Sequence, residues 1–320
     1  MKKIGIVTSG GDAPGMNAAI RAIVRVAHAR DLKVLGFEEG WKGLMANKSM
    51  ALTPRGVGGI LQLGGTFLHT ARCPEFTRKE SVEKAAEVLS HNEVEGLVVI
   101  GGNGSFNGAL DLSKKSNTLI VGIPATIDND VFGVDETIGF DTAVNTIVSE
   151  IDKIRDTAIS HERIFIVEVM GRTRGFLALT SGITAGAEVI LVPEIKYKIE
   201  NVIQTIKENS MKGKKSGVIV AAEGVGDTRR LAREIEEHAG SEVRLSVLGY
   251  AQRGGSPTVR SRLLASLFGN KAVELFLSEQ GNKIVGLQNG RIASINLEES
   301  CKKEKPLDLD LLALAKILAT

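Results

Sequence analysis

Two short glycine-rich segments contain the residue types best suited to binding a charged ligand. TSGGDAPGMNAAIRA places Gly10, Gly11 and Gly15 around a turn, and GGNGSFNGAL at 101–110 adds four glycines and the hydroxyl of Ser105 after the apolar run EGLVVI. Glycine lets a ligand approach the main chain, and the N–H groups at a helix start favour an anion. One such turn can be a simple strand-to-helix connection. Two in one sheet are explained more simply by a polyphosphate that spans both.

A pair of carboxylates follows another apolar run. PATIDND at 124–130 places Asp128 and Asp130 two residues apart beside Thr126, so in an extended loop both carboxylates could face the same space. One could accept a proton from a substrate hydroxyl while the other attends to a metal or a phosphate. The DND sequence alone is also typical of an Asx turn, but its position among phosphate loops favours chemistry.

The second half supplies cations and one more acid at predicted strand ends. MGR at 170–172, Glu223 and Arg253 each end an apolar run, whereas Arg163 and Arg244 open two of them. Forked guanidinium groups suit a sugar phosphate, and a carboxylate can accept bonds from sugar hydroxyls. Arginines at strand starts normally lie in solvent. If Arg163 and Arg244 bind ligand, we expect them to reach a neighbouring subunit, which predicts an oligomer.

The elements that position these residues alternate between strand and helix. Non-alternating apolar runs predict strands buried on both faces, at 3–9, 33–38, 96–102, 119–126, 163–171, 188–194, 217–224 and 244–250. Amphipathic stretches between them predict helices at 15–31, 80–92, 142–158 and 199–210. This order favours a doubly wound α/β fold. With 320 residues we expect two similar sheets facing a central cleft, with a break near 137–142.

Composition excludes several classes. The net charge of +2 is small and dispersed, which argues against nucleic acid as a partner. Cys73 and Cys301 are the only cysteines and lie far apart, so neither a disulfide framework nor a short-spaced metal cluster is expected, and a reducing cytoplasm fits. No apolar stretch is long enough for a membrane span.

Six segments, in order, resemble bacterial ATP-dependent 6-phosphofructokinase, the phosphofructokinase type A family. They are TSGGDAPGMNAAIR, GGTFLHTARCPEF, VVIGGNGS, PATIDND, SHERIFIVEVMGR and QRGGSP, and the match covers essentially the whole chain. The resemblance implies two Rossmann-like domains: 1–138 plus about 252–304 for ATP, and 139–251 plus about 305–320 for fructose 6-phosphate. It also implies transfer of the ATP γ-phosphoryl group to O1 of fructose 6-phosphate, a committed step of glycolysis, with Mg²⁺, in a cytoplasmic homotetramer.

The resemblance assigns roles to residues at matching positions. The ATP side comprises Gly11, Trp41, Arg72, Cys73, Gly102, Asn103, Gly104 and Ser105. The sugar-phosphate side comprises Thr126, Asp128, Asp130, Met170, Gly171, Arg172, Glu223, Tyr250 and Arg253, completed by Arg163 and Arg244 from a neighbouring subunit. Asp128 is the implied proton acceptor, acting with Thr126, Arg172 and Asp130, and Asn103 with Asp130 is the implied Mg²⁺ pair.

A second anion site between subunits is also implied, for the effectors ADP and phosphoenolpyruvate. The matching positions are Arg21, Arg25, Arg155, Glu188, Lys212, Lys214 and Lys215. KGKK on its own is typical of a solvated turn. The pattern is incomplete, because the family's usual arginine falls at Pro54 and an aspartate position is Gly59.

Several residues differ from the family pattern, and they change what we expect of Mg²⁺ dependence, sugar-phosphate affinity and phosphoryl donor. Asn103 stands where ATP users have aspartate, so we expect a retained but weakened Mg²⁺ dependence. Tyr250 replaces a histidine, which predicts modestly lower affinity for the sugar phosphate, and Trp41 replaces a tyrosine. Ala125 and Gly104 lack the side chains of pyrophosphate users, which favours ATP.

Three alternatives remain open from the sequence. The first is a pyrophosphate-dependent phosphofructokinase, and the second a kinase of another substrate with a similar glycine loop, such as an NAD kinase. The third is a non-catalytic or weakly catalytic subunit that binds nucleotide and sugar phosphate, suggested by Asn103.

Overall fold

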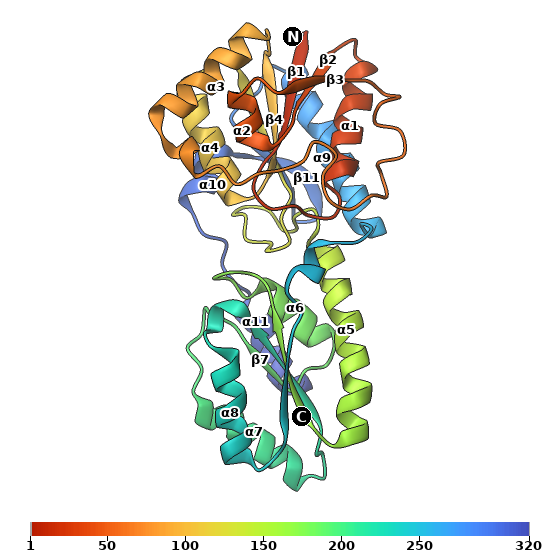
Figure 1. Cartoon of the computed structure of the whole chain (residues 1–320), viewed down its shortest axis with the longest axis vertical. Helices are drawn as coiled ribbons and strands as arrows, with labels where there is room; N and C mark the ends of the chain where they lie inside the picture. Colours follow the sequence, from red (N-terminus) through yellow and green to blue (C-terminus); the bar gives the residue numbers. More distant parts are fainter. Residues whose placement is uncertain (1, 320) are drawn as a thin grey trace. The chain divides into compact units, whose positions relative to one another are not determined.

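The computed structural model describes residues 2–319 and divides them into two compact units. Unit 1 contains the residues up to Thr142 and Arg253–Lys305, and unit 2 contains Ala143–Gln252 and the residues from Pro306 onward. Each unit is an α/β sheet flanked by helices (Figure 1). The predicted α/β class with mainly parallel sheets is confirmed, while the ligand assigned to each part of the chain stays a prediction. Within the described residues, no helix has the length and apolar character needed to cross a membrane.

The sheet of unit 1 has seven strands in the order β11-β10-β5-β4-β1-β2-β3. They are β1 (Lys3–Thr8), β2 (Lys33–Phe37), β3 (Ser49–Leu52), β4 (Gly96–Gly101), β5 (Leu119–Pro124), β10 (Lys283–Gln288) and β11 (Arg291–Asn296). The five inner strands are parallel, and β3 and β11 pair antiparallel at the two edges. The sequence did not predict β3, β10 or β11.

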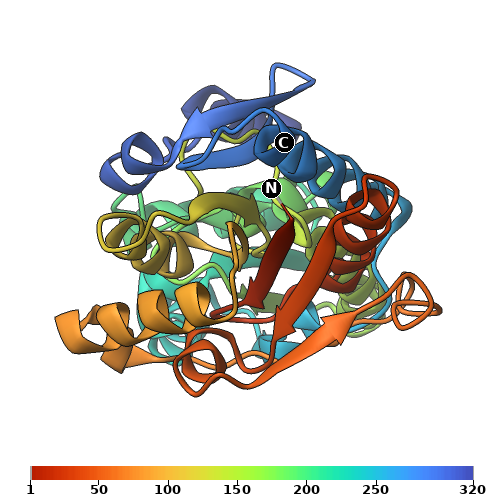
Figure 2. The same cartoon turned by 90° about the horizontal axis from the view of Figure 1, so that it is seen from above.

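Helices cover both faces of this sheet because its central strands are apolar on both sides. They are α1 (Met16–His28), α2 (Gly40–Met45), α3 (Lys79–His91), α4 (Asn103–Ser113), α9 (Val259–Leu277) and α10 (Leu297–Lys302), with a short 3₁₀ helix η1 (Pro74–Thr77). Figure 2 shows α3 and α4 on one face and α1 with α9 on the other. All six residues of β4 are buried, which confirms that its apolar run is a core strand.

Unit 2 is built on four parallel strands in the order β7-β8-β6-β9. The strands are β6 (Ile164–Val169), β7 (Val189–Leu191), β8 (Gly217–Ala222) and β9 (Val243–Val247). Its helices are α5 (Phe140–His161), which begins in unit 1, α6 (Phe176–Thr184), α7 (Ile199–Met211), α8 (Thr228–Ala239) and α11 (Leu309–Leu318), with 3₁₀ helices η2 (Glu223–Val225) and η3 (Gly249–Arg253). A buried aliphatic cluster fills the space between this sheet and α7 and α8.

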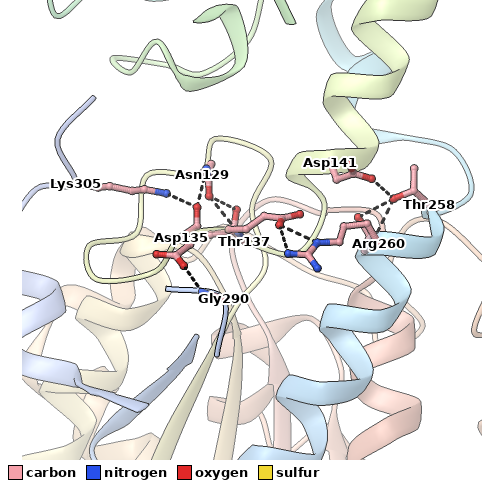
Figure 3. Close-up of polar contacts among 10 residues, drawn as sticks. Asn129, Asp135, Thr137, Asp141, Thr258, Arg260, Gly290 and Lys305 are labelled. Carbon is pink, nitrogen blue, oxygen red and sulfur yellow. Dashed lines mark hydrogen bonds and ion pairs between the residues drawn. The ribbon is translucent and has the colours of Figure 1, made fainter. Parts of the chain in front are cut away.

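The segment between β5 and α5, residues 125–139, carries both candidate carboxylates and has little regular structure of its own. Inside the segment, the Thr137 hydroxyl donates to the Thr126 carbonyl at 2.6 Å and the Thr137 N–H donates to Asn129 Oδ1 at 3.0 Å. These bonds fold the segment back on itself (Figure 3). They replace the ladder bonds that the main chain would make in a strand.

Residues from the C-terminal part of unit 1 hold the same segment from outside (Figure 3). The Gly290 N–H donates to Asp135 Oδ2 at 3.3 Å, and Lys305 Nζ donates to the Asp135 carbonyl at 3.0 Å. Arg260 binds Glu136 Oε2 through two nitrogens, at 2.9 and 2.7 Å. Charge-assisted hydrogen bonds between arginine and a carboxylate are among the stronger polar contacts in proteins. The carboxylate segment is therefore fixed by chain that follows it by more than a hundred residues.

Lys305 gives a pH-dependent contribution to stability that can be measured. Burial lowers the pKa of Lys305 to about 8, and Asp135 and Asp130 offset this only in part. Between that value and the ordinary 10.5, the unfolded chain binds a proton that the folded chain does not, so the stability contribution of this residue rises with pH. We expect the free energy of unfolding of the wild type, minus that of Lys305→Met, to increase from pH 8 to pH 10 in urea titrations. A difference that does not change with pH would contradict this reading of Lys305.

Candidate functional site

The candidate site of unit 1 lies where three neighbouring strands end. β5, β4 and β1 are adjacent and parallel, so their carboxyl ends reach the same edge of the sheet. The glycine turn 9–15 follows β1, the turn at Gly102 follows β4 and opens α4, and Thr126 follows β5. Ligands of doubly wound sheets bind at such carboxyl edges. The fold thus brings three of the predicted segments together.

The two glycine turns are joined by one buried hydroxyl. Ser105 Oγ donates to the Ser9 carbonyl at 2.9 Å, which fixes the start of α4 against the β1 turn. A side chain on Gly101 would lie 2.5 Å from both atoms, and Gly10 has a φ of 91°, so glycine is required at both positions. Because the Ser105 proton is used within the fold, we expect the main-chain N–H groups of the two turns, and not this hydroxyl, to donate to an anion here.

The carboxylate segment packs directly against the second glycine turn. A side chain on Gly102 would lie 3.4 Å from Thr126 Cβ, and the Asp128 N–H donates to Thr126 Oγ1 at 3.2 Å. Asp128 is only 6% exposed and Asp130 is half-buried. The site therefore contains two aspartates two positions apart, of which Asp128 is buried and Asp130 is half-buried.

The expectation of an extended loop is wrong. Asp128 lies in a turn, and Asn129 between the two aspartates has a φ of 53°. Asparagine tolerates this left-handed conformation better than most residues, and here its side chain accepts from the Thr137 N–H at 3.0 Å. The Asx-type role therefore belongs to Asn129, which leaves the carboxylates of Asp128 and Asp130 to be oriented by a turn instead of by strand alternation.

Arg253, predicted to bind the sugar phosphate, lies in unit 1 together with the ATP-side residues Arg72 and Cys73. A side chain on Gly11 would lie 3.6 Å from Arg253 Cζ, so this guanidinium lies beside the first glycine turn. Arg72 is exposed, and Cys73 is half-buried with its thiol 3.4 Å from Glu75 Oε2. Burial, and then the hydrogen bond to Glu75, raise the pKa of Cys73. This thiol is therefore a weak nucleophile at neutral pH.

Trp41 is placed differently from a side chain that offers an open aromatic face. It is 3% exposed and stacks on Phe76, with ring centroids 4.3 Å apart and planes at 7°. Its indole nitrogen is buried without a hydrogen-bond partner and would lie 3.1 Å from a side chain on Gly108. A direct contact between Trp41 and a nucleotide stays a prediction.

Unit 2 brings together four residues predicted to bind the sugar phosphate. The Arg172 N–H donates to Glu223 Oε1 at 2.7 Å, and Gly171 and Arg172 have φ values of 127° and 53°. The Met170 N–H donates to Gln252 Oε1 at 3.1 Å. Gln252 is fully buried and was not among the predicted residues, although it lies between Tyr250 and Arg253 in the YAQRGG segment. Tyr250 itself is 75% exposed.

Arg163 and Arg244 lie together at the amino ends of β6 and β9. Both pair with Glu242, with Arg163 Nε 2.5 Å from Glu242 Oε2 and a second ion pair from Arg244. The hydrogen bond from Arg163 is the main cause that lowers the pKa of Glu242. The sequence did not single out Glu242. The ion pairs to Glu242 do not test whether the two arginines reach a neighbouring subunit, so that role stays a prediction.

The predicted effector residues fall into separate groups. In unit 2, buried Glu188 lies 2.6 Å from Lys214 Nζ and 3.4 Å from Arg155 Nη1. Lys215 instead pairs with Glu162 at 2.9 Å, and Lys212 is exposed at the end of α7. Arg21 and Arg25 lie on α1 in unit 1. Among the predicted effector residues, Glu188 therefore contacts both Arg155 and Lys214.

The residues proposed for Mg²⁺ offer two oxygens. Asn103 Nδ2 donates to the Asp130 main-chain carbonyl at 3.2 Å, so the amide oxygen is the Asn103 atom left for a cation. Within residues 2–319, no group of three or more His, Cys, Asp or Glu residues is arranged to hold a metal. Mg²⁺ commonly binds through one or two protein oxygens together with substrate phosphates and water. The pair Asn103 and Asp130 fits that pattern.

The fold and this edge define a doubly wound α/β protein with a candidate phosphate site at adjacent strand ends. A family model for phosphofructokinase matches residues 3–276, and the chain belongs to the phosphofructokinase family. It is similar to the ATP-dependent 6-phosphofructokinase of Lysinibacillus sphaericus, with 50% identity over 319 residues that cover 100% of both chains.

Solved structures give the same result. The structure of Pichia pastoris phosphofructokinase in the T-state aligns with a TM-score of 0.88 and 33% identity over 99% of this chain, which spans 36% of that longer chain. A pyrophosphate-dependent phosphofructokinase from Marinobacter aquaeolei aligns with a TM-score of 0.86, covering 97% of this chain and 86% of that one. Its identity of 23% shows the shared fold alone.

Asn103→Asp tests the metal pair. A carboxylate adds the charged oxygen that Mg²⁺ prefers, so the Mg²⁺ concentration for half-maximal rate should fall by about tenfold. The same change removes the donor to the Asp130 carbonyl, so thermal stability without Mg²⁺ should fall and recover when Mg²⁺ and nucleotide are added. Rate curves against Mg²⁺ and thermal melts with and without Mg²⁺ check both parts. An unchanged magnesium curve would refute this account of position 103.

Proposed function

We propose that this chain phosphorylates fructose 6-phosphate at O1 with ATP and gives fructose 1,6-bisphosphate and ADP. The observation that supports this most strongly is the placement of Gly11, Gly102 and the PATIDND segment at one sheet edge, in a chain of this family. The full-length relatives named ATP-dependent 6-phosphofructokinase supply the donor and the acceptor in this proposal.

The ATP phosphates lie against the main chain of the two glycine turns in this proposal. The N–H groups at the start of α4 stabilise their negative charge. When bound, Mg²⁺ neutralises charge on the phosphates, and Asn103 with Asp130 would hold it. Gly104 is exposed, with no atom within 4 Å of where its side chain would begin, and in this proposal a third phosphate lies beside it.

Asp128 accepts the proton from the sugar O1 in the proposed reaction. Its backbone is fixed by Thr126 and it is nearly buried, so the carboxylate is held in place and partly shielded from water. A positioned general base contributes roughly 10²–10⁴-fold to a rate. Arg172 and Thr126 stabilise the migrating phosphoryl group, and Glu223 accepts bonds from sugar hydroxyls. In the proposal, Met170, Gly171, Tyr250 and Arg253, with Arg163 and Arg244 of a neighbouring subunit, complete the sugar-phosphate set.

Assembly, effectors and location are parts of the same proposal. A homotetramer would bring Arg163 and Arg244 to a neighbour's sugar phosphate. ADP or phosphoenolpyruvate would bind near Glu188 and its two ion-pair partners, Arg155 and Lys214. A cytoplasmic location is supported by the free thiols of Cys73 and Cys301, which a reducing compartment maintains.

Asp128→Ser separates catalysis from binding. We expect kcat to fall by about 10³-fold, while the KM for fructose 6-phosphate changes little, because the lost interaction forms mainly in the transition state. Initial rates in a coupled assay for fructose 1,6-bisphosphate measure both constants. Near-normal turnover of the variant would remove Asp128 as the base.

The same assay decides the donor when pyrophosphate replaces ATP. Product formed with ATP and not with pyrophosphate is the expected result for the wild type. Faster turnover with pyrophosphate would instead favour a pyrophosphate-dependent enzyme, and binding of both ligands without any product would favour a non-catalytic subunit.

A further inference from the structure

Residues 53–73 of unit 1 form a long connection between β3 and η1 without a regular helix or strand. Connections of this length are uncommon in compact domains unless they are functional. The connection ends at Arg72 and Cys73, which belong to the proposed ATP side. We call residues 62–70, most of which lie in its C-terminal half, the strap. The hydrogen bonds that hold the strap in place therefore also limit where Arg72 can lie.

Asn17 fixes the middle of the strap from the first turn of α1. Its Nδ2 donates to the carbonyls of Leu63 and Gly64 at 3.1 and 3.2 Å, and its Oδ1 accepts from the Phe67 N–H at 2.6 Å. Asn17 is 3% exposed. The amide orientation follows from chemistry, because a carbonyl only accepts and a backbone N–H only donates. All three bonds go to the strap, and a buried asparagine that loses them is costly.

Further bonds tie the C-terminal end of the strap to the β1 turn. The Thr70 hydroxyl donates to the Gly10 carbonyl at 3.0 Å, and the Thr8 hydroxyl donates to the His69 carbonyl at 2.7 Å. Leu68, which immediately precedes His69, is fully buried. The strap is thus hydrogen-bonded to Thr8, Gly10 and Asn17, which flank or belong to the first glycine turn. The strap ends two residues before Arg72.

The other end of the strap contacts the QRGGSP segment. The Ser256 hydroxyl donates to the Gln62 carbonyl at 2.7 Å, and a side chain on Gly64 would lie 2.4 Å from the Gly255 carbonyl. The strap therefore connects two segments of the candidate site that are far apart in sequence.

We propose that Asn17 is a positioning residue for nucleotide binding: through the strap, it holds Arg72 at a fixed place relative to the first glycine turn. The inference rests on the proposed function, since it takes Arg72 as a contact of the ATP phosphates. Asn17 acts through Arg72 and does not itself touch the nucleotide.

Asn17→Asp tests the proposal with little change of shape. The carboxylate keeps the acceptor for the Phe67 N–H but turns a charged oxygen toward two carbonyls in place of two donors. We expect the KM for ATP to rise by about tenfold, with kcat and the KM for fructose 6-phosphate changing by less than about threefold. Asn92→Asp is the matched control, because Asn92 Nδ2 also donates to two oxygens, on Val88 and Asn47, away from the strap. The control should leave the KM for ATP unchanged.

A double-mutant cycle with Arg72→Ala distinguishes positioning from general damage. If Asn17 acts through Arg72, Asn17→Asp should not raise the KM for ATP further in the Arg72→Ala background. Equal increases in both backgrounds would overturn the proposal, and so would an unchanged KM in Asn17→Asp itself. If the wild type did not turn over ATP, the proposed function would be refuted instead. Calorimetric titration with ATP and Mg²⁺ would then measure the dissociation constant of ATP for the same four proteins of the cycle.

If Asn17→Asp does not fold, Thr70→Val tests the same proposal. It removes only the bond to the Gly10 carbonyl, at a half-buried position where valine matches threonine in shape. We expect a rise of about threefold in the KM for ATP, absent in the Arg72→Ala background. A rise of the same size in both backgrounds would contradict a strap that acts through Arg72.

Discussion

The parallel pairing of β1, β4 and β5 is the constraint on which the candidate site depends. Val7 pairs with Val99, and Val99 with Gly122, so three turns that are far apart in sequence emerge at one edge. Parallel strands need crossover helices, and here α1 and α4 start directly at this edge with their N–H groups directed toward it. The same connectivity that buries the apolar strands therefore also assembles a place for phosphate groups.

That edge is rigid because side chains from distant segments tie its turns to one another. Ser105 joins the two glycine turns, and Asn103 joins the second turn to Asp130. The later chain, through Arg260, Gly290 and Lys305, holds the segment that carries the carboxylates. A reaction whose protein contribution is mainly positioning and electrostatics requires such fixed groups. The structure thus relates the proposed chemistry to bonds that lie outside the predicted site residues.

The sequence predicted the elements whose signal is local. The buried strands and the glycine turns follow from short apolar runs and residue type. The β10–β11 hairpin was missed although Asn289 and Gly290, both with positive φ, form a recognisable Asn-Gly turn. Glu242 and Gln252 could not be found in this way, because their partners depend on which strands are neighbours. Asn129 and Asn17 are similar cases, since their roles depend on loops that fold back over eight and about fifty residues.

The central claim is that the triphosphate lies on the glycine turns while Asp128 meets the attacking alcohol of the sugar. A crystal structure of the complex with a non-hydrolysable ATP analogue, Mg²⁺ and fructose 6-phosphate measures this directly. We expect phosphate oxygens in hydrogen-bond contact with the main chain at Gly11 and Gly102, and an Asp128 carboxylate oxygen within about 3 Å of the sugar O1. A complex in which that carboxylate faces the protein interior, or in which the phosphates avoid both turns, would contradict it.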